Sequence, residues 1–446
     1  MATTEETTLP PQEIQEEQLP QESNYNNNNK ATKLSHENNW TSKEADEADS
    51  DSSVHTLHGL RYLYNGYRFL GVYFPKTKKP LYLIWSIFIH IYVTIGLPTG
   101  FIMGIIADVT DENVEIGNLL TSVQVAINVL GCSTKIILMS ILFPKLRKCE
   151  TIFEQLDKRC ISREEKQLVR RFMHDGNRLV LLFTIAYWSY SSSTMISTVI
   201  FGRLPYNIYN PFIDAEASRG NFILAVIMEM IPVDIACFMQ VVDDSYAVIY
   251  VQILRTHVQA LIVRLENLNQ NQGEEKEDAD AQQERNVEKL RLCIIDHQNI
   301  IELYNRVSPV ISITIFVQFT ITASLLGSTL INILIFATNT ASMVASCFYV
   351  LAVVVEVFPL CYYAQCLMDE NIQLTDAIFH SNWVYQNERY RKMLIFFMQR
   401  SQKVIEFTAG KLFPITLSSF LSIAKFSFSL YTLIKEMDLK ERYGLN

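Results

Sequence analysis

The chain has 446 residues, of which 49% are hydrophobic, and its 25 Phe and 21 Tyr make it too apolar for a typical soluble protein of this size. Glycine accounts for only 15 residues, and the usual phosphate-binding, dinucleotide-binding and zinc-protease motifs do not occur. We therefore expect an integral membrane protein that is not an enzyme and that uses no cofactor, metal or nucleic acid.

The first 53 residues are predicted to be a disordered, acidic tail. They contain three Lys and twelve acidic residues, which account for the whole net charge of -9, together with an Asn run at 26–29 and few large apolar residues. They lack a basic start followed by an apolar core, so a cleaved signal peptide is not expected. Residues 54–446 are neutral overall and are predicted to form one transmembrane domain.

Seven apolar runs are long enough to cross a bilayer as helices. They lie at about 81–107, 117–143, 179–201, 221–251, 306–336, 340–367 and 412–434. The segment 375–399 carries five charged residues and is predicted to be a helix outside the bilayer, and the polar, acidic residues 267–285 a flexible linker. The predicted fold class is thus an all-α membrane protein with seven transmembrane helices and a cytoplasmic helical region.

The distribution of Lys and Arg predicts the orientation of these helices. The loop at 108–116 contains no base, whereas 144–178 contains ten, and six more occur in each of 254–297 and 368–411. Because basic loops stay in the cytoplasm, we expect a cytoplasmic N-terminus and an extracellular C-terminus. The eight cysteines lie outside the predicted outer loops, so a disulfide framework is not expected.

Several ionisable residues fall inside the predicted spans, where they need water or a partner. They are Lys135, Glu229, Asp234, Asp243, Asp244 and Glu356. A hydrated cavity or ion path is one interpretation, and buried pairing, for instance of Lys135 with an acid of the fourth helix, is the other. Pairing is favoured for Asp243 and Asp244, which lie near the predicted cytoplasmic boundary.

The outer halves of several spans are rich in aromatic residues, Met and hydroxyls, a composition that suits an enclosed site for a small apolar ligand. The candidate lining residues are Trp188, Ser191, Met195, Met228, Phe348 and Tyr349. Ordinary packing would also explain each of these residues.

The last span carries a polar stripe at helical spacing, formed by Ser418, Ser422, Lys425, Ser429 and Thr432. A helix that lines a pore or cavity has such a face. Alternatively, the hydroxyls bond to carbonyls of their own helix or to neighbouring helices.

The fourth and fifth helices are predicted to extend beyond the membrane, the fifth from about Asp296, and to form a cytoplasmic bundle with 375–399. The aromatic residues of this bundle are Phe379, Trp383, Tyr385 and Phe396. They favour either internal packing or a contact between subunits.

Five stretches between Asp296 and Met437 occur in a characteristic order: VEVFPLCYYAQCLMDE, AIFHSNWV, RYRKMLIFFMQRSQ, FTAGKLFP and SIAKFSFSLYTLI. With them the chain resembles the insect odorant receptor family, and the likeness extends more loosely over 54–446. The resemblance implies an odorant-gated, non-selective cation channel in the plasma membrane of sensory neurons, a hetero-tetramer of odorant-binding subunits and a shared co-receptor. The long insertion of a co-receptor between helices four and five is absent, so this chain resembles an odorant-tuning subunit.

The resemblance also implies roles for particular residues. The last helix would line the pore, with a gate at Leu433 and Met437 and with Ser429, Phe426 and Ser422 below it. The odorant pocket would lie in the outer parts of helices two, three, four and six, and subunits would meet through the cytoplasmic bundle. A gustatory-type receptor channel and a metabotropic, G-protein-linked receptor remain as alternatives.

Overall fold

The computed structural model describes residues 53–436 except for 75–79, 111–115, 271–278, 332–339, residue 382 and six positions between 201 and 216. Within helices, the side chains of 340–349, of 433–436 and of a few further residues are not described either. The predicted tail, except Ser53, and residues 271–278 of the predicted linker 267–285 therefore lie outside the described residues, whereas 267–270 and 279–285 are helical.

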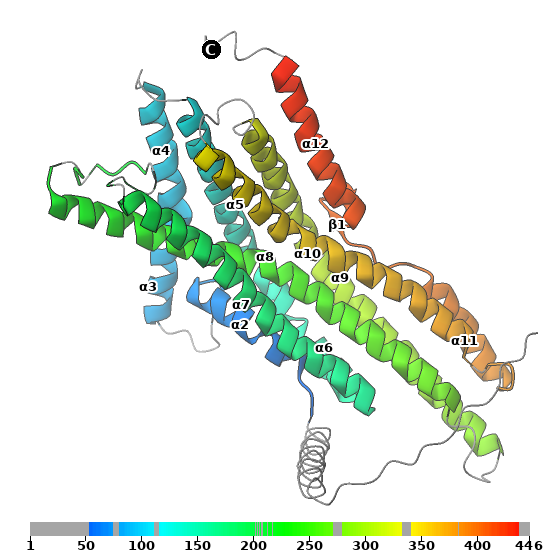
Figure 1. Cartoon of the computed structure of the whole chain (residues 1–446). Coiled ribbons are helices and arrows are strands. Elements are labelled where there is room, and N and C mark those ends of the chain that lie inside the picture. Colours follow the sequence, from blue (N-terminus) through cyan, green and yellow to red (C-terminus); the bar gives the residue numbers. More distant parts are fainter. Residues whose placement is uncertain are drawn as a thin grey trace, which may run out of the picture. The chain divides into compact units, whose positions relative to one another are not determined.

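The described part is built almost entirely from helices (Figure 1). The first described element is a short 3-10 helix, η1, and one described segment, η2, is π-helical. In chain order the elements are η1 (Thr56–Leu60), α2 (Arg61–Phe69), α3 (Pro80–Ile89), η2 (His90–Gly96), α4 (Leu97–Thr110), α5 (Ile116–Arg147), α6 (Glu150–Arg159), α7 (Arg163–Ile200), α8 (Arg219–Gln270), α9 (Ala279–Ile331), α10 (Thr340–Phe379), α11 (Glu388–Ser401), β1 (Thr408–Ala409), β2 (Phe413–Pro414) and α12 (Leu417–Glu436).

The predicted all-α membrane fold is confirmed. Five helical stretches of the described part are long and apolar enough to cross a membrane: Pro80–Thr110, Leu119–Arg147, Arg219–Leu268, Asp280–Ile331 and Val350–Phe379. Helices α7 and α12 occupy the other two predicted spans. Large apolar side chains such as Ile84, Ile95 and Ile106 point outward, as they do where a helix faces lipid.

Helix α8 forms the centre of the domain. Residues 241–254 are buried on every side of the helix, and α8 contacts α5, α7, α9 and α10. The enclosure buries the many apolar side chains of this stretch, and it buries Asp243 and Asp244 with them.

Helices α8 and α9 are longer than a bilayer requires. They contain 52 and 53 residues, so each is roughly 78 Å long, against a hydrocarbon core of about 30 Å. Helix α9 begins at Ala279, well before the expected Asp296, because buried Val287, Leu290 and Cys293 continue its apolar face. The predicted projection beyond the membrane is therefore longer than the sequence pattern indicated.

The single helix expected over 375–399 is divided in two. Helix α10 ends at Phe379 and α11 begins at Glu388. Asn387 has an extended backbone, and its side chain accepts a hydrogen bond from the backbone N–H of Tyr390, so it caps the start of α11. The Trp383 indole donates to the carbonyl of Phe379 at 3.2 Å, which satisfies one of the last carbonyls of α10.

A tight turn between β1 and β2 fixes the start of α12. The two strands pair antiparallel, and the N–H of Gly410 between them donates to the carbonyl of Ser312 in α9 at 2.8 Å. Gly410 has a φ of 60°, and a Cβ at this position would lie 2.6 Å from the ring of Phe316. Only glycine is accommodated there, which gives a physical reason for the Gly in FTAGKLFP.

Candidate functional site

The residues expected to line a ligand pocket lie on α7, α8 and α10. Ser191 and Met195 are buried, one helical turn apart on the inner face of α7, whereas Trp188 and Met228 are 52% and 40% exposed. Phe348 and Tyr349 lie in the part of α10 whose side chains fall outside the described residues. The structure thus brings Ser191 and Met195 to one face and turns Trp188 and Met228 outward, and their role in a pocket stays a prediction.

Carboxylates of α8 face this part of α7 and the loop after it. The Ser191 hydroxyl donates to Oδ1 of Asp234 at 3.2 Å. Glu229 is 4% exposed and accepts the backbone N–H of Tyr206 at 3.2 Å, while the N–H of Tyr209 donates to the carbonyl of Gly100 in α4 at 3.1 Å. The contacts of Tyr206 and Tyr209 hold the loop after α7 against α8 and α4. The Ser191 hydroxyl and the carboxylates of α8 are polar groups that can orient a small, mostly apolar ligand.

A buried polar network joins α5, α7, α8, α9 and α10. The ammonium of Lys135 lies 2.7 Å from Oδ1 of Asp244, and the Tyr187 hydroxyl donates to Oδ2 of the same carboxylate at 3.1 Å. Lys135 also donates to the side-chain oxygen of Gln318, whose amide nitrogen donates to Glu356. The predicted pairing of Lys135 with an acid of the fourth helix is confirmed, and Gln318 connects this pair to the acid of α10.

The neighbouring Asp243 behaves differently from Asp244. It is 1% exposed, and neither carboxylate oxygen has a hydrogen-bond partner among the described residues. The expectation that Asp243 is paired is therefore wrong. Successive helical residues point about 100° apart, so only one of two adjacent acids can face Lys135.

Helix α12 presents most of its described side chains outward. Phe426 is 59% exposed, Ser422 and Ser429 are exposed as well, and Ser427 is the one buried side chain among those described on this helix. The Ser422 hydroxyl donates to the carbonyl of Ser418 at 2.9 Å, so bonding within the helix coexists with exposure of the polar stripe. The Leu433 side chain and the whole of Met437 lie outside the described residues.

The aromatic residues expected at a subunit contact lie at the end of α10 (Phe379), in the connection to α11 (Trp383 and Tyr385) and within α11 (Phe396). Phe379, Tyr385 and Phe396 are 53%, 78% and 72% exposed, whereas Trp383 is half-buried against the core. Large exposed aromatic side chains of this kind are typical of a protein contact.

Comparisons by sequence and by fold both find insect odorant receptors as similar proteins. The family model described as 7tm Odorant receptor matches residues 115–428. The chain is 35% identical to odorant receptor 42a of Drosophila melanogaster, over 88% of this chain and 94% of that one. It is 34% identical to odorant receptor 42b over 86% and 94%, and 33% identical to odorant receptor 59b over 87% and 96%, both also from Drosophila melanogaster.

The fold is similar to that of the insect olfactory receptor OR5 from Machilis hrabei. The TM-score is 0.69 for the structure of that receptor alone, at 17% sequence identity over 85% of this chain and 98% of that one. For its complex with eugenol the TM-score is 0.68, at 16% identity over 86% and 100%.

Proposed function

Because the chain belongs to the insect odorant receptor family, as its C-terminal motifs predicted, we propose that it is the odorant-binding subunit of an odorant-gated cation channel. The chain is a multi-pass membrane protein and a receptor rather than an enzyme. The proposed channel is a non-selective hetero-tetramer with a family co-receptor, in the plasma membrane of sensory neurons.

The exposure of α12 is the observation that carries this proposal. The helix contacts α9 and α10, yet its described side chains are mostly exposed on both its apolar and its hydroxyl-bearing sides. Lipid can cover Leu421 and Phe428, but Ser422 and Ser429 require water or protein. Several such helices around one axis would enclose a hydrated pore lined by these serines and by Phe426, with the gate at Leu433 and Met437.

The ligand acts in this proposal by shifting a population of conformations. A small volatile molecule binds between the outer parts of the helices, where Ser191 and Met195 face inward, and it favours the conformation in which the gate is wide and hydrated. To raise the open fraction from about 1% to about half, the odorant must bind the open state roughly 100-fold more tightly than the closed state.

Subunits would associate outside the bilayer. The exposed side chains of Phe379, Tyr385 and Phe396 offer an apolar surface there that the single chain leaves uncovered. Burying these rings against a co-receptor would hold the tetramer together while the transmembrane helices move.

Cysteine accessibility tests the pore assignment. The chain is co-expressed with a family co-receptor, and odorant-evoked current is recorded before and after a charged, membrane-impermeant thiol reagent is applied. We expect the reagent to block the current of Ser429→Cys and to spare that of Ser427→Cys, a matched control two residues away on the buried side of α12. Equal block of both variants, or no block at Ser429→Cys, would refute a pore lined by this face.

The same co-expression experiment distinguishes the two alternative functions, a metabotropic receptor and a gustatory-type channel. A metabotropic receptor would give current only through a G protein and other channels, and its current would survive modification of Ser429→Cys. A gustatory-type channel would respond to soluble tastants rather than to a panel of volatile compounds.

A further inference from the structure

Helix α5 carries a buried amide that has no acceptor for its N–H groups. The side chain of Gln124 is 6% exposed, and its amide nitrogen has no hydrogen-bond partner among the described residues. This nitrogen carries two hydrogens, and leaving them unbonded away from water costs free energy that folded proteins normally avoid. Gln124 therefore needs an acceptor that the described part of the chain does not supply.

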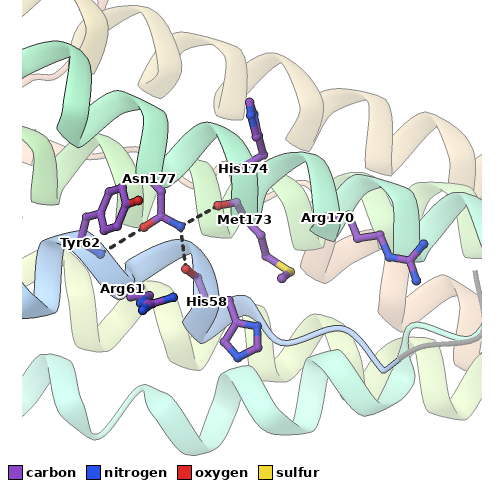
Figure 2. Close-up of a pocket in the computed structure, with 7 residues that line it drawn as sticks. All are labelled: His58, Arg61, Tyr62, Arg170, Met173, His174 and Asn177. Carbon is purple, nitrogen blue, oxygen red and sulfur yellow. Dashed lines mark hydrogen bonds between the residues drawn. The ribbon is translucent and has the colours of Figure 1, made fainter. Parts of the chain in front are cut away.

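Another amide of the chain shows how such a group is normally used. The amide nitrogen of Asn177, on α7, donates to the carbonyl of His58 at 2.7 Å and to that of Met173 at 3.0 Å (Figure 2). Its oxygen accepts the backbone N–H of Tyr62 at 3.1 Å, so the amide attaches η1 and α2 to α7. The nitrogen of Gln124 makes no such bond to a described residue, and both of its N–H groups remain available to a ligand.

The position of Gln124 follows from the side of α5 on which it lies. Four residues at spacings of four, three and four share this side: Gln124, Asn128, Gly131 and Lys135. Asn128 donates to the side chain of Gln240 in α8 at 3.4 Å, and Gly131 packs against α9. Lys135 pairs with Asp244 of α8. This side of α5 therefore faces α8 and α9, and the order of the contacts shows that α5 and α8 run in the same direction.

The inner side of α7 begins at the same polar network. The Tyr187 hydroxyl donates to Asp244 at 3.1 Å. One turn further along α7, the Ser191 hydroxyl donates at 3.2 Å to Asp234, which precedes Asp244 in α8. Met195 is buried one more turn along. Helix α7 thus runs antiparallel to α8, and its inner side leads away from the network toward the start of α8.

These contacts place the amide of Gln124 level with the Ser191 hydroxyl. Helices α5 and α7 both bond to Asp244, so distances along them can be compared from that point. Asp234, the partner of Ser191, lies roughly 15 Å from Asp244 along α8, and Gln124 lies roughly 16 Å from Lys135 along α5 in the same direction. The unbonded amide therefore lies at the level where the odorant is proposed to bind.

Other polar groups at this level already have partners within the protein. The Ser191 hydroxyl and the Asn128 amide donate to side chains of α8. The hydroxyl of Thr329 in α9 donates to the carbonyl of Leu325 at 2.7 Å. The ammonium of Lys135 is held by the polar network, and the carboxylates of α8 repel an anion. A neutral ligand with an acceptor oxygen complements this set of groups.

We infer that Gln124 recognises the oxygen of a neutral carbonyl-containing odorant, a ketone or an ester. The inference rests on the proposed function, since it specifies the ligand class of that channel. The amide N–H donates to the carbonyl oxygen, and the apolar remainder of the odorant packs against Met195. A carbonyl oxygen only accepts hydrogen bonds, so it matches a group that is left to donate. A hydrocarbon of the same shape leaves the amide unbonded and binds less tightly.

Matched pairs of volatile compounds test this inference in cells that co-express the chain with a family co-receptor. The probes are methyl ketones and acetate esters of increasing chain length. Each is paired with the hydrocarbon in which carbon groups replace its oxygen atoms, so the two members differ in hydrogen bonding but hardly in shape. The concentration for half-maximal current is measured for wild type, for Gln124→Met and for Gln167→Met, which makes the same change at an exposed position of α7. Methionine keeps the length of the side chain and removes only the amide.

We expect wild type and Gln167→Met to respond to the preferred carbonyl compound at a concentration roughly tenfold lower than to its hydrocarbon partner. In Gln124→Met the two concentrations should come within about twofold of each other, because the carbonyl compound loses its hydrogen bond. This change in preference separates a contact with the ligand from a role in folding, which would weaken the response to both members alike.

Three results would overturn the inference and leave the proposed channel standing. They are a wild type that responds to volatile compounds without preferring the carbonyl members, a Gln124→Met variant that keeps the preference, and a Gln124→Met variant that loses the responses to both members equally. Silence of the co-expressed wild type toward every volatile compound would instead contradict the proposed function, and the inference with it.

Discussion

Removal of Lys135 is the substitution for which the structure gives the clearest energetic expectation. Its ammonium and the carboxylate of Asp244 are 2.7 Å apart, and both side chains are almost completely buried. At an effective dielectric constant of about 20, their attraction is roughly 6 kcal/mol, and the desolvation of two buried ions offsets much of it. The ion pair therefore contributes little net stability, but removing one partner leaves a buried, unpaired charge and lowers the free energy of unfolding strongly.

Lys135→Met leaves the Asp244 carboxylate with the Tyr187 hydroxyl as its hydrogen-bond donor. We expect the free energy of unfolding to fall by about 3–5 kcal/mol. In Lys135→Met/Asp244→Asn the unpaired charge is gone, so most of this loss should be recovered. Lys145→Met, at an exposed lysine of the same helix, should change stability by less than about 0.5 kcal/mol.

Thermal unfolding in detergent, followed with a thiol-reactive dye, measures these differences. Cys132, Cys149 and Cys361 are free and buried, so they react only when the helices separate. The expected order of Tm is wild type and Lys145→Met highest, the double variant next and Lys135→Met several degrees lower. A Lys135→Met protein as stable as wild type, or a double variant less stable than Lys135→Met, would refute the account of the network.

Three further predictions concern other parts of the chain. Gly176→Ala should destabilise by about 1–3 kcal/mol, because its Cβ would meet the carbonyl of Gly59 at 2.9 Å, whereas Gly220→Ala, with a nearest neighbour at 3.7 Å, should not; equal Tm values would contradict this. Burial raises the pKa of Asp157, although hydrogen bonds from Thr56 lower it. The stability that Asp157 contributes is therefore full below its unfolded pKa of about 4 and is lost as pH rises through the raised folded pKa. Asp157→Asn should flatten the dependence of Tm on pH above about 4, and an unchanged slope would speak against this assignment. Leu433→Ala should raise the basal current of the co-expressed heteromer, and unchanged basal and odorant-evoked currents would exclude a gate at that position.

The helical architecture was predictable because bilayer thickness and apolar composition leave few choices. Only helices satisfy the backbone inside lipid without a closed barrel, so long apolar runs had to be helical. Helix lengths outside the bilayer are less constrained. The early start of α9 depends on Val287 and Leu290 packing inside the domain, which charged neighbours in the sequence conceal. By contrast, Asn387 followed by Glu388 is a recognisable helix start, and it could have revealed the break before α11.

Contacts between helices were only partly predictable. The charge of Lys135 alone indicated that it needs an acid. Gln318 connects Lys135 to Glu356, but an uncharged residue in an apolar helix gives no sequence signal for such a role. The choice of Asp244 over Asp243 depends on the rotation of α8 about its axis. The outward direction of Trp188 and Met228 depends in the same way on the rotation of α7 and α8, since an aromatic or Met residue suits a lipid-facing surface as well as a pocket.

Excised membrane patches test most directly whether this receptor is itself part of an ion channel. Inside-out patches from cells that co-express the chain with a family co-receptor are bathed in solution free of nucleotides, and a panel of volatile compounds is applied. The account predicts cation current that begins with the odorant and reverses near the potential expected for a non-selective pore. Odorant responses in intact cells that disappear in every nucleotide-free patch and return with GTP would contradict it.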